Sequence, residues 1–269
     1  MPPIVLALLT EKSYSEPMQH KPHSFNQNPV SCDSCSLINV CLPSGLSSKE
    51  LEQLETAIDK TVKIKKKETV FNANDKIEGI YAVKSGSIKT SISNQDGQEQ
   101  VLEFHLPGDM LGFDAFNTGT HTCHATALED TFLCKIPIDT FDNLCEHLPG
   151  LRRELRHQVG KEIAHNQSLL LSLGQQQTDE RFATFLLTMS EHYQSRGFSS
   201  KEFVIPMSRQ DLSNYLGMAV ETLSRIISRM TESGIIKIDR RMVVISDSEK
   251  LHRLAHSYCQ NSSTNKNLA

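Results

Sequence analysis

The sequence lacks the features that would place it in a membrane or mark it for export. No apolar run in its 269 residues approaches the ~18–20 residues that span a bilayer. The short apolar run at 4–9 has no basic flank, so we expect no signal peptide, a cytoplasmic location and no membrane partner. The 38% hydrophobic and 22% charged residues suffice for the cores of about two domains at this length.

Signatures of common enzyme classes are also missing. Neither G-x-G-x-x-G nor G-x-x-x-x-G-K-S/T occurs, so no dinucleotide or nucleoside-triphosphate loop is indicated. The local sequence shows no Ser–His–acid set, and we therefore expect no enzyme. His105, His121 and His124 could form a metal patch with Cys123, but scattered histidines are more often surface or core residues. With a net charge of −4, any surface for nucleic acid must be local.

Cysteine is the residue type that stands out. Three of the seven, Cys32, Cys35 and Cys41, follow C-x2-C-x5-C spacing, which in a reducing compartment indicates metal ligation rather than disulfides. Four others are candidates for the fourth ligand that closes such a site: Cys123, Cys134, Cys145 and Cys259. Zinc and an iron–sulfur cluster both accept four thiolates, and the long x5 arm favours the larger cluster. A single later cysteine can equally be a small buried hydrophobe.

The first half of the chain predicts one capped helix followed by short strands. Ser47 and Glu50 form a capping-box pattern ahead of apolar residues at helical spacing. From 63 to 137, short alternating apolar runs are separated by glycines, and Asp96–Gly97 is a strong hairpin signal. Many short strands at this spacing predict a small barrel or roll, although a β-sandwich fits the pattern equally well.

A long helix is predicted from about 147 to 174. Its apolar residues form one narrow stripe, which a polar residue interrupts: Leu151, Leu155, Val159, Ile163, Asn166 and Leu170. The stripe can pack on the roll, or it can form a two-fold coiled-coil seam in which the asparagine sets the register. We favour the dimer seam.

Residues 207–238 have the pattern of a helix-turn-helix. Ser208 precedes a short amphipathic helix, Gly217 permits a sharp turn, and Val220 opens a second amphipathic helix that stops at Gly234. A hairpin follows whose tip carries two arginines. Arginines are costly to bury and useful beside phosphates, so we interpret this hairpin as a wing.

The outward face of the second helix carries side chains suited to reading bases. These are Val220, Glu221, Ser224 and Arg225. Arginine can donate two bonds to guanine, glutamate accepts from cytosine N4, and a valine methyl can pack on the thymine methyl. Around them we expect phosphate contacts from Ser208, Arg209, Thr222, Arg229, Lys237, Arg240 and Arg241. The alternative is that Glu221 and Arg225 form only a surface ion pair.

These features together resemble the FNR branch of the Crp–Fnr transcription regulators. The cysteine spacing, "FHLPGDMLGFDAF", "FLCKIP", "RGFS" and "NYLGMAVETLSR" occur in the order of that family, from Cys32 to about His256. The resemblance implies an α+β fold with an N-terminal β-roll like a cyclic-nucleotide-binding domain, a long dimerisation helix and a C-terminal winged helix-turn-helix. The implied organisation is a disordered tail at 1–30, a cluster-binding loop and β-roll sensory domain at 31–146, a dimerisation helix at 147–176, a winged helix-turn-helix at 177–256 and a tail at 257–269.

The resemblance also implies an oxygen sensor. Its 4Fe–4S cluster would be held by Cys32, Cys35, Cys41 and, from its place in "FLCKIP", Cys134. Without oxygen the cluster would promote homodimerisation and binding to double-stranded DNA at a palindrome resembling TTGAT, four bases, ATCAA. Oxygen would degrade the cluster and switch binding off. By the same carry-over, Val220, Glu221, Ser224 and Arg225 would read the half-site, and the hairpin around 94–98 would contact RNA polymerase.

One residue departs from the family pattern. Members often have an acidic residue near the position of Asn166, where facing like charges weaken the dimer in air. Asparagine removes that repulsion, so we expect a dimer that oxygen suppresses less sharply.

Two rival functions share parts of this pattern. A relative that binds cyclic nucleotides needs an arginine for the cyclic phosphate, and "GFDAFNTGTHTCHATAL" contains none, so we expect no cyclic nucleotide. A zinc-stapled DNA-binding regulator without oxygen sensing remains the alternative, because thiolates bind either metal.

Overall fold

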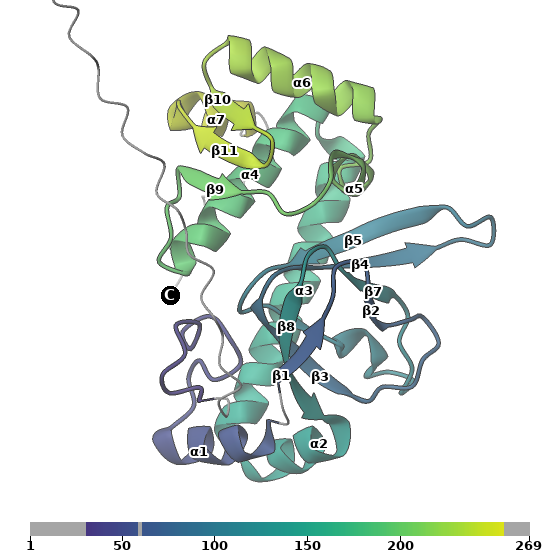
Figure 1. Cartoon of the computed structure of the whole chain (residues 1–269), viewed down its shortest axis with the longest axis vertical. Helices are drawn as coiled ribbons and strands as arrows, with labels where there is room; N and C mark the ends of the chain where they lie inside the picture. The colour runs from purple at the N-terminus through teal and green to yellow at the C-terminus, as the bar shows by residue number, and fades with distance from the viewer. Residues whose placement is uncertain (1–30, 59–60, 256–269) are drawn as a thin grey trace, which may run out of the picture.

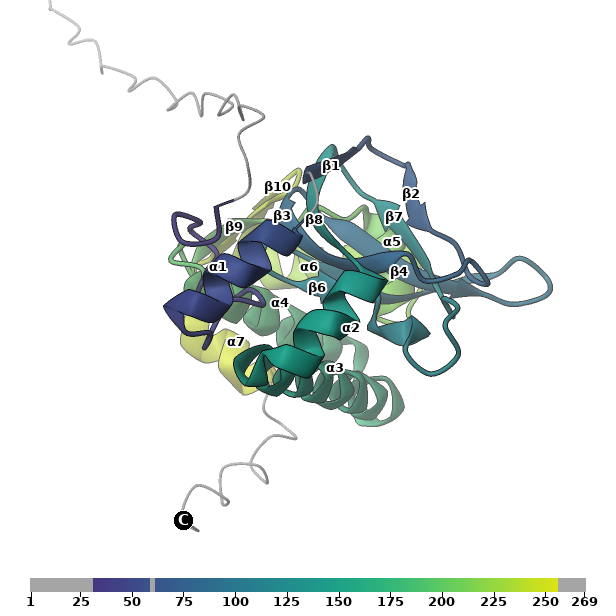
Figure 2. The same ribbon diagram turned by 90° about the horizontal axis from the view of Figure 1, so that it is seen from below.

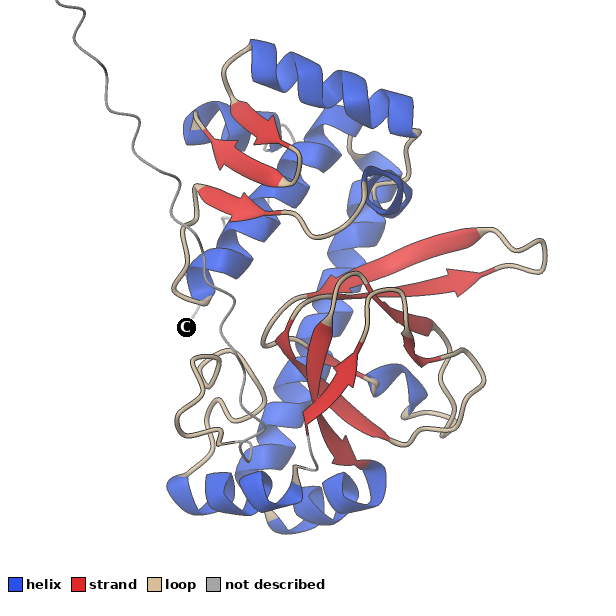
Figure 3. Cartoon of the chain, viewed as in Figure 1, coloured by secondary structure: helices blue, strands red, loops and turns tan. Residues whose placement is uncertain are grey.

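The computed structural model describes residues 31–58 and 61–255 (Figures 1 and 3). The tails expected at 1–30 and 257–269, and with them Cys259, lie outside these residues. A long helix, α3 (Pro149–Gln175), runs beside a β-roll and leads to the C-terminal helical domain (Figure 1). No helix among the described residues is both long and apolar enough to cross a membrane.

The described part of the chain begins with a segment of consecutive turns, residues 31–46, which we call the cluster loop. Within it, the NH of Cys35 donates to the carbonyl of Cys32 at 3.0 Å. Helix α1 (Ser48–Ala57) follows, and the predicted capping box is present, with Ser47 as the N-cap and Glu50 reaching back to its NH at 2.9 Å. Leu54 is the residue of α1 that is buried against the rest of the protein.

The roll is built from two four-stranded antiparallel sheets. One sheet has the order β1 (Thr61–Ile64), β8 (Thr131–Pro137), β3 (Gly79–Ser85), β6 (Met110–Leu111), and the other β2 (Thr69–Phe71), β7 (His124–Ala127), β4 (Ile88–Ser93), β5 (Glu99–His105). A short 3-10 turn, η1 (Phe113–Ala115), follows β6. The β4–β5 hairpin turns at Gly97, whose φ of +74° is the left-handed conformation that the Asp-Gly signal predicts.

Two helices follow the roll. The first is α2 (Ile138–His147), in a segment for which no element was predicted. The predicted long helix is α3, which starts at Pro149, a residue suited to a first helical position because it needs no NH partner. Seen from below, α1, α2 and the lower end of α3 lie together under the roll (Figure 2).

One predicted seam residue is corrected here. Leu151 is fully buried inside the protomer, in a core with Phe141 and Leu148, so it cannot face a partner. One residue turns an α-helix by about 100°, so each four-residue step overshoots a full turn by about 40°. Along α3 the stripe therefore winds away from the roll, and Ile163 is 54% exposed.

The C-terminal domain contains the predicted helix-turn-helix. Its elements are α4 (Thr178–Ser195), β9 (Glu202–Val204), α5 (Arg209–Tyr215), α6 (Val220–Glu232), β10 (Ile236–Asp239), β11 (Met242–Ile245) and α7 (Ser248–Ala255). Gly217 (φ +60°) forms the turn between α5 and α6, and Gly234 (φ +71°) ends α6, as the sequence predicts. Strand β9, which was not predicted, adds a third strand to the β10–β11 wing.

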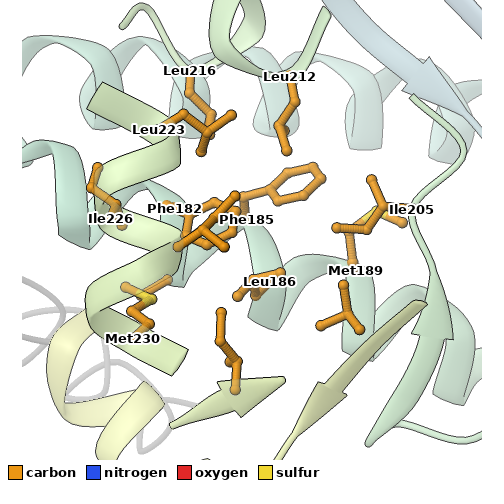
Figure 4. Close-up of a cluster of buried hydrophobic side chains, with 14 of the residues drawn as sticks. Phe182, Phe185, Leu186, Met189, Ile205, Leu212, Leu216, Leu223, Ile226 and Met230 are labelled. Atoms are coloured by element: carbon orange, nitrogen blue, oxygen red, sulfur yellow. The ribbon is translucent and has the colours of Figure 1, made fainter. Parts of the chain in front are cut away.

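The core of this domain gathers around α4 and α6. Phe182, Leu186, Leu223 and Ile226 point into its centre (Figure 4). The same core includes three residues of the roll, on and just after β5: Val101, Phe104 and Leu106. The two domains therefore share one hydrophobic core at their junction.

Candidate metal centre and nucleic-acid interface

Four cysteines line one cavity of about 330 Å³ between the cluster loop and the roll. Cys32, Cys35 and Cys41 come from the cluster loop, and Cys134 comes from the middle of β8, where it pairs with Ala82 of β3. Of the three candidates for the fourth position that the structure describes, Cys134 is the one that lines this cavity. The remaining walls are mostly apolar, including Leu37, Leu42, Leu54, Met110 and Ile136.

The other described cysteines lie elsewhere. Cys123 is buried in the interior of the roll, with its thiol 3.4 Å from a carboxylate oxygen of Asp114. Cys145 is half-buried on α2. Neither lines the cavity. Of the possible histidine patch, His121 is buried and bonded to Asp114 at 3.0 Å, which fits a core histidine.

Burial favours the neutral form of the Cys32, Cys41 and Cys134 thiols, because it raises their pKa values. Burial raises the pKa of Cys32 to about 12 and that of Cys41 to about 12, and the nearby Cys134 thiol adds to both shifts. A metal centre must displace these protons, since thiolates are the ligands. Within the described residues, no three His, Cys, Asp or Glu side chains are placed to hold a single metal ion.

Lys84 is a functional candidate that the sequence analysis missed. It is the one charged side chain among those that line the cavity. Its charge acts to lower the pKa of Cys32 and of Cys134, against the larger effect of burial. No sequence signal identified Lys84, because the pairing of β3 with β8, which places it near Cys134, joins segments about fifty residues apart.

The residues expected to read bases lie at the start of α6, at the end of the molecule away from the cluster loop (Figure 1). Glu221 and Arg225 are exposed, and Val220 and Ser224 are half-buried. No ion pair joins Glu221 to Arg225 in the described part of the chain, so the surface-pair alternative has no support. Leu223 and Ile226 are buried, so the opposite face of α6 points away from the core of the domain.

The residues expected to contact phosphate are mostly exposed around that face. Arg209 begins α5, and Arg240 and Arg241 form the tip of the wing. Ser208 caps α5, accepting from the NH of Asp211 at 3.0 Å, and Thr222 is half-buried on α6. Arg229 is exposed and also forms an ion pair within the protein. Its guanidinium lies 2.7 Å from both carboxylate oxygens of Asp179 on α4, so it ties α6 to α4.

The exposed part of the predicted seam begins at Ile163, near the middle of α3. Leu155 packs against the same core as Leu151, and Val159 is half-buried. Ile163 is 54% exposed, Asn166 is exposed and Leu170 is 70% exposed. Large apolar residues exposed along one side of a helix indicate a surface that binds a partner.

Comparisons with known proteins match both domains. Residues 61–147 match the family model of the cyclic nucleotide-binding domain, and residues 180–254 match the Crp-like helix-turn-helix domain. The fumarate nitrate reduction regulatory protein of Klebsiella oxytoca is 38% identical over 226 residues, 84% of this chain and 90% of that protein. The anaerobic regulatory protein of Haemophilus influenzae is 38% identical over 225 residues, 84% of this chain and 88% of that protein.

The chain belongs to the FNR branch of the Crp–Fnr family. Among solved structures, FixK2 from Bradyrhizobium japonicum is similar with a TM-score of 0.68 and 28% identity, covering 72% of this chain and 96% of that one. A Crp/Fnr-family regulator from Thermus thermophilus shares the fold, with a TM-score of 0.58 and 20% identity over 73% of this chain and 98% of that one. This family member is therefore a DNA-binding transcription regulator rather than an enzyme, and the fold expected from the sequence is confirmed.

Proposed function

We propose that this regulator senses oxygen through a 4Fe–4S cluster held by Cys32, Cys35, Cys41 and Cys134. The observation that carries the proposal is that these four thiols line one cavity with apolar walls. Four thiolates are a ligand set that a 4Fe–4S cluster accepts. The names of its relatives, which refer to fumarate and nitrate reduction and to anaerobic regulation, support the same function.

A bound cluster would supply iron–thiolate bonds that tie the cluster loop to β8 and that oxygen destroys. The chain's own residues determine what this tie does. Leu42 of the cluster loop is 2% exposed and lies in one core with Leu148 and Leu151, at the lower end of α3. The position of the loop is thereby coupled to the base of the helix that carries the exposed seam.

In the anaerobic state, homodimerisation through Val159, Ile163, Asn166 and Leu170 would bring two α6 helices to double-stranded DNA. Arg225 with Val220, Glu221 and Ser224 would read each half of a palindrome similar to TTGAT, four bases, ATCAA. Arg209, Arg240 and Arg241 would contact phosphates, with Ser208 and Thr222 beside them. Such a regulator would act in the cytoplasm.

The exposed β4–β5 hairpin is the proposed contact for RNA polymerase. Its tip is ordered by Asn94, whose side-chain oxygen accepts from the NH groups of Asp96 and Gln98 at 3.0 and 2.8 Å. Ile92, just before this tip, is 42% exposed. A preformed loop with an exposed apolar residue costs little ordering when it binds a partner.

We propose that no cyclic nucleotide binds. The polar cavity between the roll and α3 is lined by three carboxylates, from Glu103, Asp109 and Glu162. Burial raises the pKa of Glu162, and the nearby Glu103 raises it further. Lys161 and three histidines also line this cavity, but its volume of about 50 Å³ is too small for a nucleotide. Neither this cavity nor the segment 112–128 offers an arginine for a cyclic phosphate.

The test is the absorption spectrum of protein purified without oxygen, with iron and sulfide assays before and after air is admitted. We expect a broad visible band and about four iron atoms per chain, as one cubane cluster requires, with bleaching in air. Colourless protein that carries zinc would instead favour the zinc-stapled regulator without oxygen sensing.

A further inference from the structure

Helix α1 holds the cluster loop through a carboxylate near its C-terminal end. The Oε1 atom of Glu55 accepts from the NH of Asp33 at 2.9 Å and from the hydroxyl of Ser31 at 3.4 Å. These two residues flank Cys32, one of the proposed cluster ligands. The loop has little regular structure of its own, so Glu55 anchors the first ligand to α1.

The same helix holds the dimerisation helix through a second carboxylate, at its N-terminal end. Glu50 accepts from the NH and the hydroxyl of Ser47 through Oε2, at 2.9 and 2.7 Å. Its other oxygen, Oε1, accepts from the NH of Gly150 at 2.7 Å. Gly150 is the second residue of α3, one hundred positions further along the chain.

Glu50 supplies what the N-terminus of α3 does not have. The first turn of α3 contains no acidic residue, and its N-cap, Leu148, has no side chain that can accept a hydrogen bond. A carboxylate at this end satisfies an unpaired NH and meets the positive end of the helix dipole. The hydrogen bonds from Ser47 and from Gly150 hold the pKa of Glu50 below its usual value.

The fit between the two helices is close. A Cβ atom added to Gly150 would lie 2.6 Å from the carboxylate oxygens of Glu50. A side chain at this position of α3 would therefore displace the Glu50 carboxylate from its contact with the helix. Next to the polar contact, Leu54 of α1 shares a core with Leu148 and Leu151 of the α3 base, each at most 5% exposed.

We propose that α1 is the element that transmits the state of the cluster to the dimer seam. A shift of the cluster loop moves α1 through Glu55, and α1 moves the base of α3 through Glu50 and Gly150. The inference rests on the proposed function, because it needs a loop whose position depends on the cluster. In this scheme Glu50 and Glu55 are positioning residues for the oxygen response of the dimer, and neither binds a ligand.

The experiment compares the wild type with Glu50→Ala and Glu50→Gln, all full-length and purified without oxygen. Glu52→Ala is the matched control, since Glu52 is exposed on the same helix. Iron and sulfide are assayed first, and sedimentation then gives the dimer dissociation constant before and after air. We expect about four iron atoms per chain in every variant, because no ligand is altered.

The oxygen-dependent change in the dimer dissociation constant is the decisive quantity. We expect it to be at least about tenfold smaller in Glu50→Ala than in the wild type, as the loss of a charge-assisted hydrogen bond predicts. Glu50→Gln, which can still accept but carries no charge, should lie between them, and Glu52→Ala should match the wild type. A full oxygen response in Glu50→Ala with intact iron would overturn the inference. Absence of iron in the wild type would instead overturn the proposed function.

A second measurement, hydrogen exchange, can be made on protein without the cluster. Hydrogen exchange in the first turn of α3, measured on apo-protein, should be about tenfold faster in Glu50→Ala, since the NH of Gly150 loses its partner. Glu55→Gln should leave this exchange unchanged and still reduce the oxygen response, because it releases the other end of α1. If Glu50→Ala exchanges like the wild type, α1 does not restrain α3.

Discussion

The side-chain oxygen of Asn214, on α5, accepts a hydrogen bond of 2.6 Å from the backbone NH of Val101, on β5. The amide nitrogen of the same side chain donates to the carbonyl of Glu99 at 2.7 Å. One asparagine of the helix-turn-helix thus forms hydrogen bonds to the edge strand of the roll. Beside it, Lys89 of β4 lies 2.8 Å from the Asp211 carboxylate and 2.9 Å from that of Glu99. The DNA-binding domain is therefore docked on the hairpin proposed to contact RNA polymerase.

Asn214→Ala should weaken this docking. The substitution leaves the NH of Val101, which is 1% exposed, without its partner. We expect the free energy of unfolding to fall by about 1–3 kcal/mol, the cost of an unsatisfied buried donor. Urea denaturation monitored by circular dichroism measures this change. Asn117→Ala, at an exposed site of the roll, is the control, and equal stability of the two variants would contradict the prediction.

The Lys89–Asp211 ion pair predicts a dependence of stability on pH. Burial raises the pKa of Asp211, but the hydrogen bonds from Lys89 and Ser208 outweigh this and hold it below the ordinary value of 3.8. A depressed carboxylate pKa stabilises the fold above pH 3.8, and this contribution is lost as the pH falls through the folded-state pKa. The stability difference between wild type and Lys89→Met should therefore be present at pH 7 and vanish in acid. Lys66→Met, at an exposed lysine, should show no such difference at any pH.

Cys134→Ser should abolish the cluster. A serine hydroxyl cannot replace the thiolate on β8, so iron content should fall from about four atoms per chain to near zero, with loss of DNA binding. Cys145→Ser changes a half-buried thiol on α2 outside the cavity and should keep the iron and the binding. An iron-loaded, DNA-binding Cys134→Ser protein would refute the assignment of the fourth ligand.

Arg225→Ala and Arg240→Ala should affect DNA binding in different ways. The first removes a base-reading side chain, so discrimination at one base pair should drop by about 1–3 kcal/mol. The second removes a charge at the wing tip, so binding to all sequences should weaken alike and its salt dependence should become less steep. Fluorescence anisotropy with the palindrome and single-base variants, at several salt concentrations, separates the two. A purely uniform loss in Arg225→Ala would argue against base reading.

Asn166→Asp should make the dimer more sensitive to oxygen. Asn166 is exposed between Ile163 and Leu170, and aspartates at this position would face each other across the two-fold seam. We expect the dimer in air to weaken more than the dimer without oxygen, as sedimentation velocity would show. Gln167→Glu introduces the same charge at the neighbouring residue and controls for net charge. Wild-type protein that is already a clean monomer in air at micromolar concentration would contradict the premise.

Features that depend on neighbours in the chain were predictable from the sequence alone. The capping box at Ser47, the hairpin at Gly97 and the turn at Gly217 all follow from residues within a few positions, because caps and tight turns are local interactions. The inward and outward faces of α6 likewise follow from helical periodicity. Together with the cysteine spacing, these patterns indicated both the DNA-binding domain and the metal site.

The tertiary structure decided what depends on contacts between distant residues. Spacing left four candidates for the fourth ligand, and only packing of the cluster loop against β8 brings Cys134 to the cavity. The apolar stripe of α3 could not show that Leu151 is buried while Ile163 is exposed, since the neighbouring elements determine which side of a helix is covered. Glu50 meets Gly150 across one hundred residues, and no local pattern encodes such a contact. Local sequence specifies the elements, and their packing specifies which side chains act together.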